Sequence, residues 1–325
     1  MRPKKLTTVL FLLLLVGGVI AGCASIATPA GQSTSEPVTL KVAVLPILDS
    51  LPIRVAQKEG FFEKNGVKVE LIPVQSAPER DQIVSAGQAD GMINEVLSTM
   101  FYNKDAIRVQ IVRFARAATR DASLFSIIAS AKSGITDVNG LKGKEIGISE
   151  GTVIDYLTDR LLEAEGLKPD EIVTVAVPKI PDRQALILSG ELAAGTQPEP
   201  LPALAASQGA KIVLSDTSHP EYSYSTISFR KEIIDQHPEA VRAFLAGLEQ
   251  AVQKINSNPD LYKQFLVDEQ LIPPPLAESY KIPQMTTAGV PSPEQWQDVL
   301  DWAKTNGLLD KDISYESSVT NAYLP

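Results

Sequence analysis

The chain has 325 residues, with 30 basic residues against 39 acidic ones and a formal net charge of −9. No basic patch stands out, so the composition argues against a nucleic-acid-binding protein. The two histidines, His219 and His237, stand alone in the sequence, which argues against a histidine-based metal site or a Ser/His/Asp triad. We therefore expect no metal and no other cofactor, and the length favours two domains.

The N-terminus predicts a secretory signal. Arg2, Lys4 and Lys5 precede an apolar stretch at residues 9–20, and no acidic residue interrupts it. The stretch is shorter than the ~20 residues that a bilayer-spanning helix needs. Soon after it comes Cys23, which is the only cysteine of the chain, so no structural disulfide is expected.

Residues 19–23, Val-Ile-Ala-Gly-Cys, resemble a bacterial lipobox. The resemblance implies a lipoprotein signal peptide at residues 1–22 and a Cys23 that carries acyl chains such as palmitate. Residues 23–37 are rich in Ser, Thr, Ala, Gly and Pro and predict a flexible tether. We expect an extracytoplasmic protein anchored by lipid. The sequence leaves open a Gram-positive cell surface or a periplasm.

Strands and helices alternate from about Val38 onward. Apolar and β-branched runs predict strands at residues 39–45, 67–74, 91–93 and 106–114, with helices at 53–64, 79–86 and 95–102 between them. Strands separated by helices of this length imply right-handed βαβ units and a mostly parallel sheet.

A second α/β unit is predicted at about residues 132–220. Its strands fall at 145–148, 172–177 and 211–214, and its helices end at Gly166 and Gly190. Residues 190–198 show no clear apolar strand. The remainder is helical, at 239–255, 260–267 and 293–304, and we expect these helices, with Trp296 and Trp302, to return to the first unit.

Four short segments of the sequence, taken together with this order of elements, indicate the kind of protein. Residues 56–70 carry Glu-Gly-Phe-Phe, 87–91 read Gly-Gln-Ala-Asp-Gly, 141–148 open with Leu-Lys-Gly-Lys, and Glu199 precedes Pro200. Together they resemble solute-binding proteins of the nitrate/sulfonate/taurine class, which includes thiamine-pyrimidine and riboflavin receptors. The resemblance covers nearly the whole mature chain.

The resemblance implies a type II periplasmic-binding-protein-like α/β fold with two lobes, each a mostly parallel sheet flanked by helices. Lobe 1 would comprise residues 38–123 and 228–325, and lobe 2 residues 124–227, with extended crossings at 123–130 and 224–229 as hinges. The implied function is non-enzymatic. A monomer would capture a small organic solute in the cleft between the lobes and deliver it to an ABC permease.

Two other functions remain open at this point. One is an enzyme of a pyrimidine-biosynthesis or lyase branch on the same fold. The other is a sensory lipoprotein without a transport role.

Ligands of open α/β sheets bind beyond the carboxyl ends of the strands. The loops there supply eight predicted ligand-binding residues, and the second crossing supplies Tyr224 as the ninth: Asp49, Ser50, Asn94, Glu95, Ser149, Gly151, Thr152, Glu199 and Tyr224. The hydroxyls of Ser149 and Thr152, with free amides around Gly151, would cradle an anion or a carbonyl, or else cap the next helix. Glu199 would accept hydrogen bonds from a ligand amine, and Tyr224 would stack on a planar ligand or pack in the hinge.

The charges of these loops suggest the kind of ligand. They hold Asp49, Glu95, Glu150 and Glu199 but no Lys or Arg, whereas a sulfonate or a nitrate needs its charge offset. The sequence therefore favours a neutral or amine-bearing heterocycle over a sulfonate or nitrate. Three arginines precede the first crossing: Arg113, Arg116 and Arg120. Each of them would either form a solvated or inter-lobe salt bridge or face the cleft.

Overall fold

A computed structural model describes residues 36–325 of the chain. The predicted signal peptide, Cys23 and nearly all of the tether lie outside the described residues and stay predictions. No helix between residues 36 and 325 combines the length and the apolar character that a membrane crossing requires.

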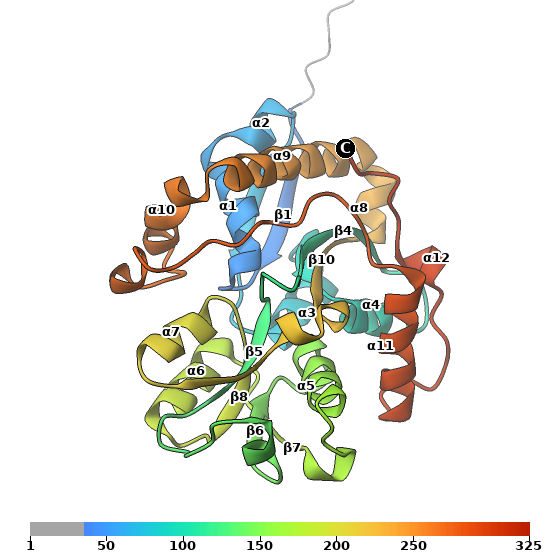
Figure 1. Cartoon of the computed structure of the whole chain (residues 1–325). Helices are drawn as coiled ribbons and strands as arrows, with labels where there is room; N and C mark the ends of the chain where they lie inside the picture. The colour runs from blue at the N-terminus through green and yellow to red at the C-terminus, as the bar shows by residue number, and fades with distance from the viewer. Residues whose placement is uncertain (1–35) are drawn as a thin grey trace, which may run out of the picture. The chain divides into compact units, whose positions relative to one another are not determined.

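Two five-stranded sheets organise the chain (Figure 1). The first has the order β2 (Lys68–Pro73), β1 (Thr39–Val44), β3 (Gly91–Asn94), β10 (Tyr224–Arg230), β4 (Val109–Ala117). The second has the order β7 (Val173–Ala176), β6 (Glu145–Ile148), β8 (Ala194–Pro198), β5 (Phe125–Ala129), β9 (Lys211–Ser215). We use lobe 1 and lobe 2 for these sheets and the helices that flank them; the lobe boundaries predicted above stay a proposal.

Each sheet contains a single antiparallel strand. β10 runs antiparallel to both β3 and β4, and β5 runs antiparallel to both β8 and β9. In each lobe this is the first strand that the chain forms after crossing from the other lobe. The remaining four strands of each sheet point the same way, which confirms the predicted fold class of two mostly parallel sheets flanked by helices.

The helices cover the sheets on their faces. Lobe 1 carries α1 (Leu51–Lys58), α2 (Phe61–Lys64), α3 (Ala77–Ser85), α4 (Val96–Tyr102), α8 (Lys231–Gln236), α9 (Pro238–Ser257) and α10 (Lys263–Asp268). Lobe 2 carries α5 (Val153–Ala164), α6 (Ile180–Ser189) and α7 (Leu201–Ser207), and the chain ends with α11 (Pro293–Thr305) and α12 (Tyr315–Ser318).

The long helix α9 lies against α1 and α2 (Figure 1). The rings of Phe62 and Phe244 stack with their centroids 4.9 Å apart. Gly247 allows this approach, because a Cβ there would lie 2.9 Å from the Phe62 ring. The predicted helix 53–64 is in fact α1 and α2, because Gly60 between them takes a left-handed φ of 68°.

The sequence pattern did not predict strand β8, although it is the central strand of the lobe 2 sheet. It reads Ala-Gly-Thr-Gln-Pro and is buried throughout. Gly195 pairs with Gly147 of β6, and the aliphatic stem of Arg183 lies over both. The strand is therefore built from small and polar residues that fit beneath a close helix, and this pattern differs from an apolar β run.

Direct contacts hold the two lobes together. The amide of Leu48 in lobe 1 donates to the carbonyl of Glu199 in lobe 2 at 2.9 Å. The amide of Ile180 in lobe 2 donates to the carbonyl of Gln75 in lobe 1 at 3.1 Å. The structure is therefore a closed form, in which backbone groups of one lobe meet those of the other.

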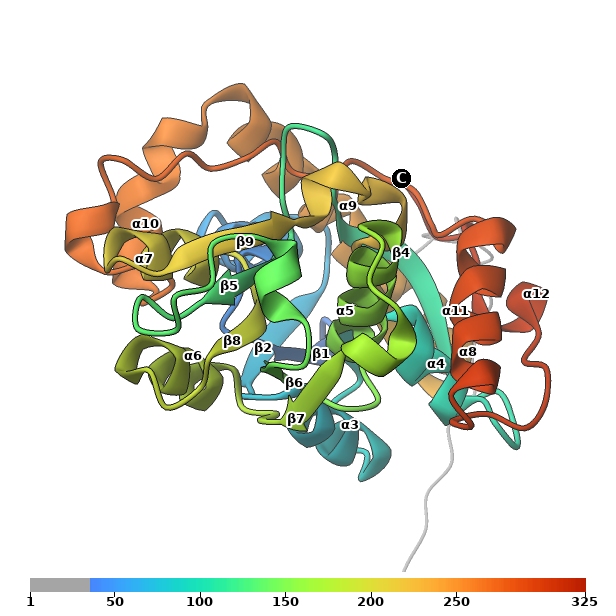
Figure 2. The same cartoon turned by 60° about the horizontal axis from the view of Figure 1, so that its bottom comes forward.

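Helix α11 contacts both lobes. It packs against α4 of lobe 1 and α5 of lobe 2, and Figure 2 shows the three helices together. The indole N–H of Trp302 donates to Asp159 of α5 at 3.0 Å, and Asp298 accepts hydrogen bonds from Tyr156 and Arg160. From the sequence, we expected the C-terminal helices to pack on the first unit alone. This expectation is wrong for α11, which packs on both lobes.

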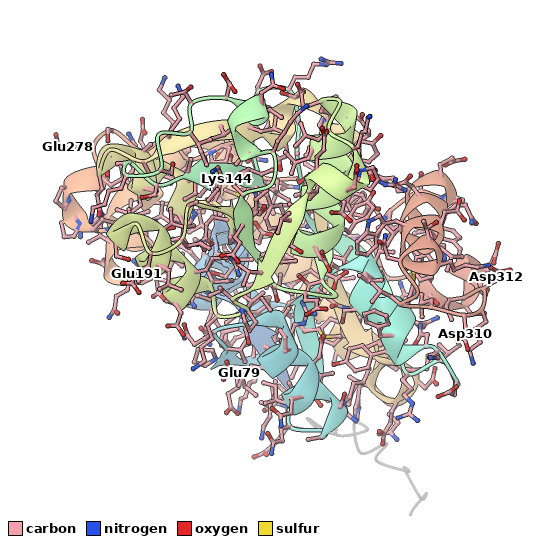
Figure 3. All side chains as sticks on the ribbon, turned by 90° about the horizontal axis from the view of Figure 1, so that it is seen from below. Glu79, Lys144, Glu191, Glu278, Asp310 and Asp312 are labelled. Atoms are coloured by element: carbon pink, nitrogen blue, oxygen red, sulfur yellow. The ribbon has the colours of Figure 1, made fainter. Side chains whose placement is uncertain are left out.

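Many charged side chains lie at the surface, whereas others such as Arg113, Arg183 and Asp216 are buried. Lys144, Glu191, Glu278, Asp310 and Asp312 are exposed, and in the view from below Glu278 lies at the left edge and Asp310 and Asp312 at the right edge (Figure 3). The acidic balance of the chain is therefore carried in part by solvated carboxylates.

Candidate functional site

A small cavity lies where the carboxyl ends of strands from both sheets meet. Side chains after β1 and β3 line it from lobe 1, and side chains after β6 and at the start of α5 and α6 line it from lobe 2. Its volume is about 40 Å³, which is room for only a few water molecules. An organic solute can therefore enter only when the lobes separate.

Five of the nine predicted ligand-binding residues line this cavity: Asp49, Asn94 and Glu95 from lobe 1, and Ser149 and Thr152 from lobe 2. The structure brings them together from segments that lie far apart in the sequence. Whether they contact a ligand stays a prediction.

Asp49 is fully engaged by protein groups. The guanidinium of Arg116 lies 3.2 Å from one carboxylate oxygen, and the hydroxyl of Ser225 donates to the other. A second nitrogen of Arg116 donates to the carbonyl of Ser123 at 2.8 Å, on the segment that crosses to lobe 2. This buried pair therefore ties the end of β1 to the first crossing.

Glu95 caps helix α4 from within the cavity wall. Its Oε1 accepts a hydrogen bond from the amide of Ser98 at 3.0 Å. Burial raises the pKa of Glu95 to about 7, and the charge of Arg80 lowers it only in part. The carboxyl therefore holds a proton more tightly than an exposed glutamate does.

Arg80 was missed by the sequence-based reasoning. It sits on α3, is 2% exposed and lines the cavity, so the prediction of a cleft without Lys or Arg is wrong. Its Nε donates to Asp81 at 2.8 Å and its Nη1 to the carbonyl of Ile93 at 3.3 Å. Its Nη2 has no hydrogen-bond partner and lies 3.9 Å from Glu95 Oε1. The sequence carried one signal for the burial of Arg80. It lies four residues before Val84, so the two side chains share one face of α3.

The side-chain amide of Asn94 is held in one orientation. Its nitrogen donates to the hydroxyls of Thr99 at 3.0 Å and Ser228 at 3.2 Å. The Thr99 hydroxyl gives its own hydrogen to the carbonyl of Glu95, so toward Asn94 it can only accept. The Asn94 Oδ1 is consequently left as a buried acceptor without a partner.

In lobe 2, Thr152 caps helix α5, as one of the two alternatives predicted. Its hydroxyl oxygen accepts from the amide of Ile154 at 3.2 Å and donates to the carbonyl of Ser149 at 2.7 Å. The hydroxyl of Ser149 is buried and has no partner. The amide of Gly151 is not free for a ligand, because it donates to Asp155 at 2.8 Å.

The other four predicted residues do not line the cavity. The Ser50 hydroxyl donates to the carbonyl of Ile47, and Gly151 takes a left-handed φ of 66° within the turn before α5. Tyr224 packs edge-to-face on Phe114 and donates its hydroxyl to the carbonyl of Gln295 at 3.1 Å.

Glu199, the fourth of these residues, borders a separate hollow beside the crossing. The hydroxyl of Tyr280 donates to its carboxyl at 3.3 Å. Burial raises the pKa of Glu199 to about 7. Glu199 is thus a half-buried residue at the lobe contact rather than a side chain of the cavity.

Comparison with known proteins gives the family. The family model described as NMT1/THI5 like matches residues 48–261. The chain belongs to the NMT1/THI5-like family. This confirms the resemblance to the solute-binding class that the four sequence segments had suggested.

Relatives of this NMT1/THI5-like chain carry two kinds of name. A Bacillus subtilis protein named for binding aliphatic sulfonates is 25% identical, and the match covers 97% of this chain and 95% of that protein. A Saccharomyces cerevisiae protein named 4-amino-5-hydroxymethyl-2-methylpyrimidine phosphate synthase is 24% identical over 90% of this chain and 88% of that protein.

Among solved structures, the alkanesulfonate-binding protein of Xanthomonas axonopodis, bound to MOPS, matches with a TM-score of 0.75 and 17% identity. That match covers 88% of this chain and 99% of the other. At this identity it shows that the two proteins share the periplasmic-binding-protein-like fold.

A more voluminous hollow than this cavity lies elsewhere, on lobe 1. It has a volume of about 560 Å³ and lies at the amino ends of β3 and β4, near Gly87 and Arg108. Its Arg230 already pairs with Asp90 and Glu232. We place the site at the small cavity instead, because strand carboxyl ends from both lobes meet there. Within residues 36–325 no group of three His, Cys, Asp or Glu side chains could hold a metal ion.

Proposed function

We propose that this protein is an extracytoplasmic solute-binding lipoprotein. It captures a small organic solute between its lobes and delivers it to an ABC importer. The observation that carries this proposal is the cavity itself. It is lined by polar and apolar side chains of both lobes and is too small to admit a solute unless the lobes part. Hinge closure around a ligand is the action that such a construction serves.

The proposal takes further support from the family. The Bacillus subtilis relative, matched over nearly its whole length, is named for binding a small solute. The yeast relative is named for a synthase, which keeps the enzyme alternative in view. The cavity favours binding, because Ser149, the one free hydroxyl there, has no hydrogen-bonded base among the described residues.

For the solute, we propose a neutral or amine-bearing heterocycle rather than a sulfonate or nitrate. The charges at the cavity are already matched within the protein. Arg116 pairs with Asp49, and Arg80 lies between Asp81 and Glu95. No surplus positive charge is left to offset an anion, so a ligand without net negative charge fits best.

The site of action rests on the N-terminal sequence. The lipobox-like residues before Cys23 support acylation of that cysteine and a place outside the cytoplasm. Replacing Cys23 by Ala should move the protein from the membrane fraction to the soluble fraction. Unchanged partition after this substitution would contradict the anchor.

Mass spectrometry of the small molecules released from the purified protein tests the function. We expect one solute in near-stoichiometric amount, and we expect it to raise the melting temperature when it is returned to the stripped protein. Cells that lack the gene should import this solute more slowly. Normal import with intact binding would favour a sensory lipoprotein, and turnover of the solute by the pure protein would favour an enzyme.

A further inference from the structure

Three buried polar atoms at the cavity have no hydrogen-bond partner: Arg80 Nη2, Asn94 Oδ1 and Ser149 Oγ. Buried polar atoms are nearly always paired in folded proteins, and each exception needs an explanation. Here the exceptions come from α3, the last residue of β3 and the residue after β6, and the three residues that carry them line the same small cavity. Two belong to lobe 1 and one to lobe 2.

We propose that these three atoms are the hydrogen-bonding set that recognises the solute. The inference rests on the proposed function, and it specifies the chemistry of the ligand at the same site. In the solute-free protein water can serve these atoms, and the solute replaces it.

The chemistry of each atom defines what the solute must offer. Arg80 Nη2 can only donate and Asn94 Oδ1 can only accept, whereas a serine hydroxyl does both. The other polar atoms of Arg80 and Asn94 are committed to Asp81, Ile93, Thr99 and Ser228, so neither group can turn to change its role. The solute must therefore present an acceptor together with an N–H donor.

An amide or an amino-substituted azine has such an edge, with an acceptor adjacent to an N–H donor. A nitrate or an alkanesulfonate offers acceptors only. Either anion could serve Arg80 and Ser149 but would leave the acceptor of Asn94 buried and unpaired, which disfavours binding. The set therefore selects small uncharged molecules with an amide or amino-azine edge.

The test uses titration calorimetry on the full-length protein after its own ligand has been removed by unfolding and refolding. The probes are cytosine, nicotinamide and 4-aminopyrimidine, with ethanesulfonate and nitrate as acceptor-only compounds. At least one of the first three should bind, and the two anions should not. If none of the first three binds, the inference is overturned. If an anion binds instead, the proposed role in solute capture stands, while the inference and the proposed class of solute fall. If neither the probes nor the released small molecules bind, the proposed role falls as well.

Substitutions test whether Arg80 and Ser149 bind the probe. Ser149→Ala removes a hydroxyl that makes no side-chain hydrogen bond in the structure, so the fold should be kept while affinity for the bound probe falls ~2- to 12-fold. Arg80→Lys keeps the charge but loses the guanidinium fork, and affinity should fall by about 10-fold or more.

Thr226→Val is the matched control. The hydroxyl of Thr226 is also buried without a partner, but the residue does not line the cavity. Its affinity should stay within about 2-fold of the native value, a change too small for the loss of a ligand hydrogen bond. Native affinity in Ser149→Ala, with folding confirmed by circular dichroism, would overturn the inference even if Arg80→Lys does not fold.

Discussion

The two lobes bring different chemistry to the cavity that they share. Lobe 1 contributes three charged side chains, Asp49, Arg80 and Glu95. Among the described residues that line the cavity, those from lobe 2 carry no charge and include apolar groups such as Phe125 and Ile180. From this contrast we infer that lobe 1 orients the solute, whereas lobe 2 closes over it and excludes water. Burial in the cavity wall is the physical reason for the raised pKa of Glu95.

The largest expected effect comes from breaking the charged network of lobe 1. Arg116→Met leaves Asp49 buried without its cation, and this should lower the free energy of unfolding by ~3–5 kcal/mol. Urea unfolding measures the change. Adding Asp49→Asn should recover a large part of the loss, because both charges are then absent. A loss below about 1 kcal/mol in the single variant would show that water reaches Asp49.

A second prediction concerns pH. Because burial raises the pKa of Glu95 and Glu199 to about 7, the folded protein holds these protons more tightly than the unfolded chain does. Their contribution to stability is full below about pH 4.5 and is lost as the pH rises through about 7. Each carboxyl should account for a fall on the order of 2–3 kcal/mol across that range.

Glu95→Gln and Glu199→Gln separate the cavity from the lobe contact. Each substitution should flatten part of the fall in unfolding free energy between pH 5 and 7, and the double variant should flatten most of it. A native pH profile in both single variants would mean that these carboxyls stay ionised in the folded protein.

The smallest effect is expected in lobe 2, where Thr152 acts on its own helix. Thr152→Ala removes the cap of α5 and should cost about 1 kcal/mol of unfolding free energy. Thr152→Ser keeps the hydroxyl and should lie close to the native protein. If serine does not restore stability, the methyl group of Thr152, packed at the cavity, is what matters.

The same contrast explains which parts of the molecule were predictable from the sequence. Strands such as β1 and β6 were found because their apolar runs depend on local pattern alone. β8 was missed because its small and polar residues make sense only beneath α6 and Arg183, and the local pattern of residues does not report how closely that helix packs on the strand.

The site was predicted in part for a related reason. Loops at strand ends gave Asp49, Asn94, Glu95, Ser149 and Thr152 from topology. Arg80 lies inside a helix, and its burial at the cavity is decided by how α3 packs, which no local pattern reports. Tyr224 was predicted to stack on a planar ligand or to pack in the hinge, and its ring packs on Phe114 rather than in the cavity.

Small-angle X-ray scattering tests the central claim, that the lobes open to admit a solute and close around it. The full-length protein would be measured after removal of its ligand and again after return of the released small molecules. We predict that the stripped protein has a larger radius of gyration than this closed structure, and that the returned ligand brings the scattering to the closed curve. Identical closed scattering in both states, with binding confirmed by calorimetry, would contradict the account.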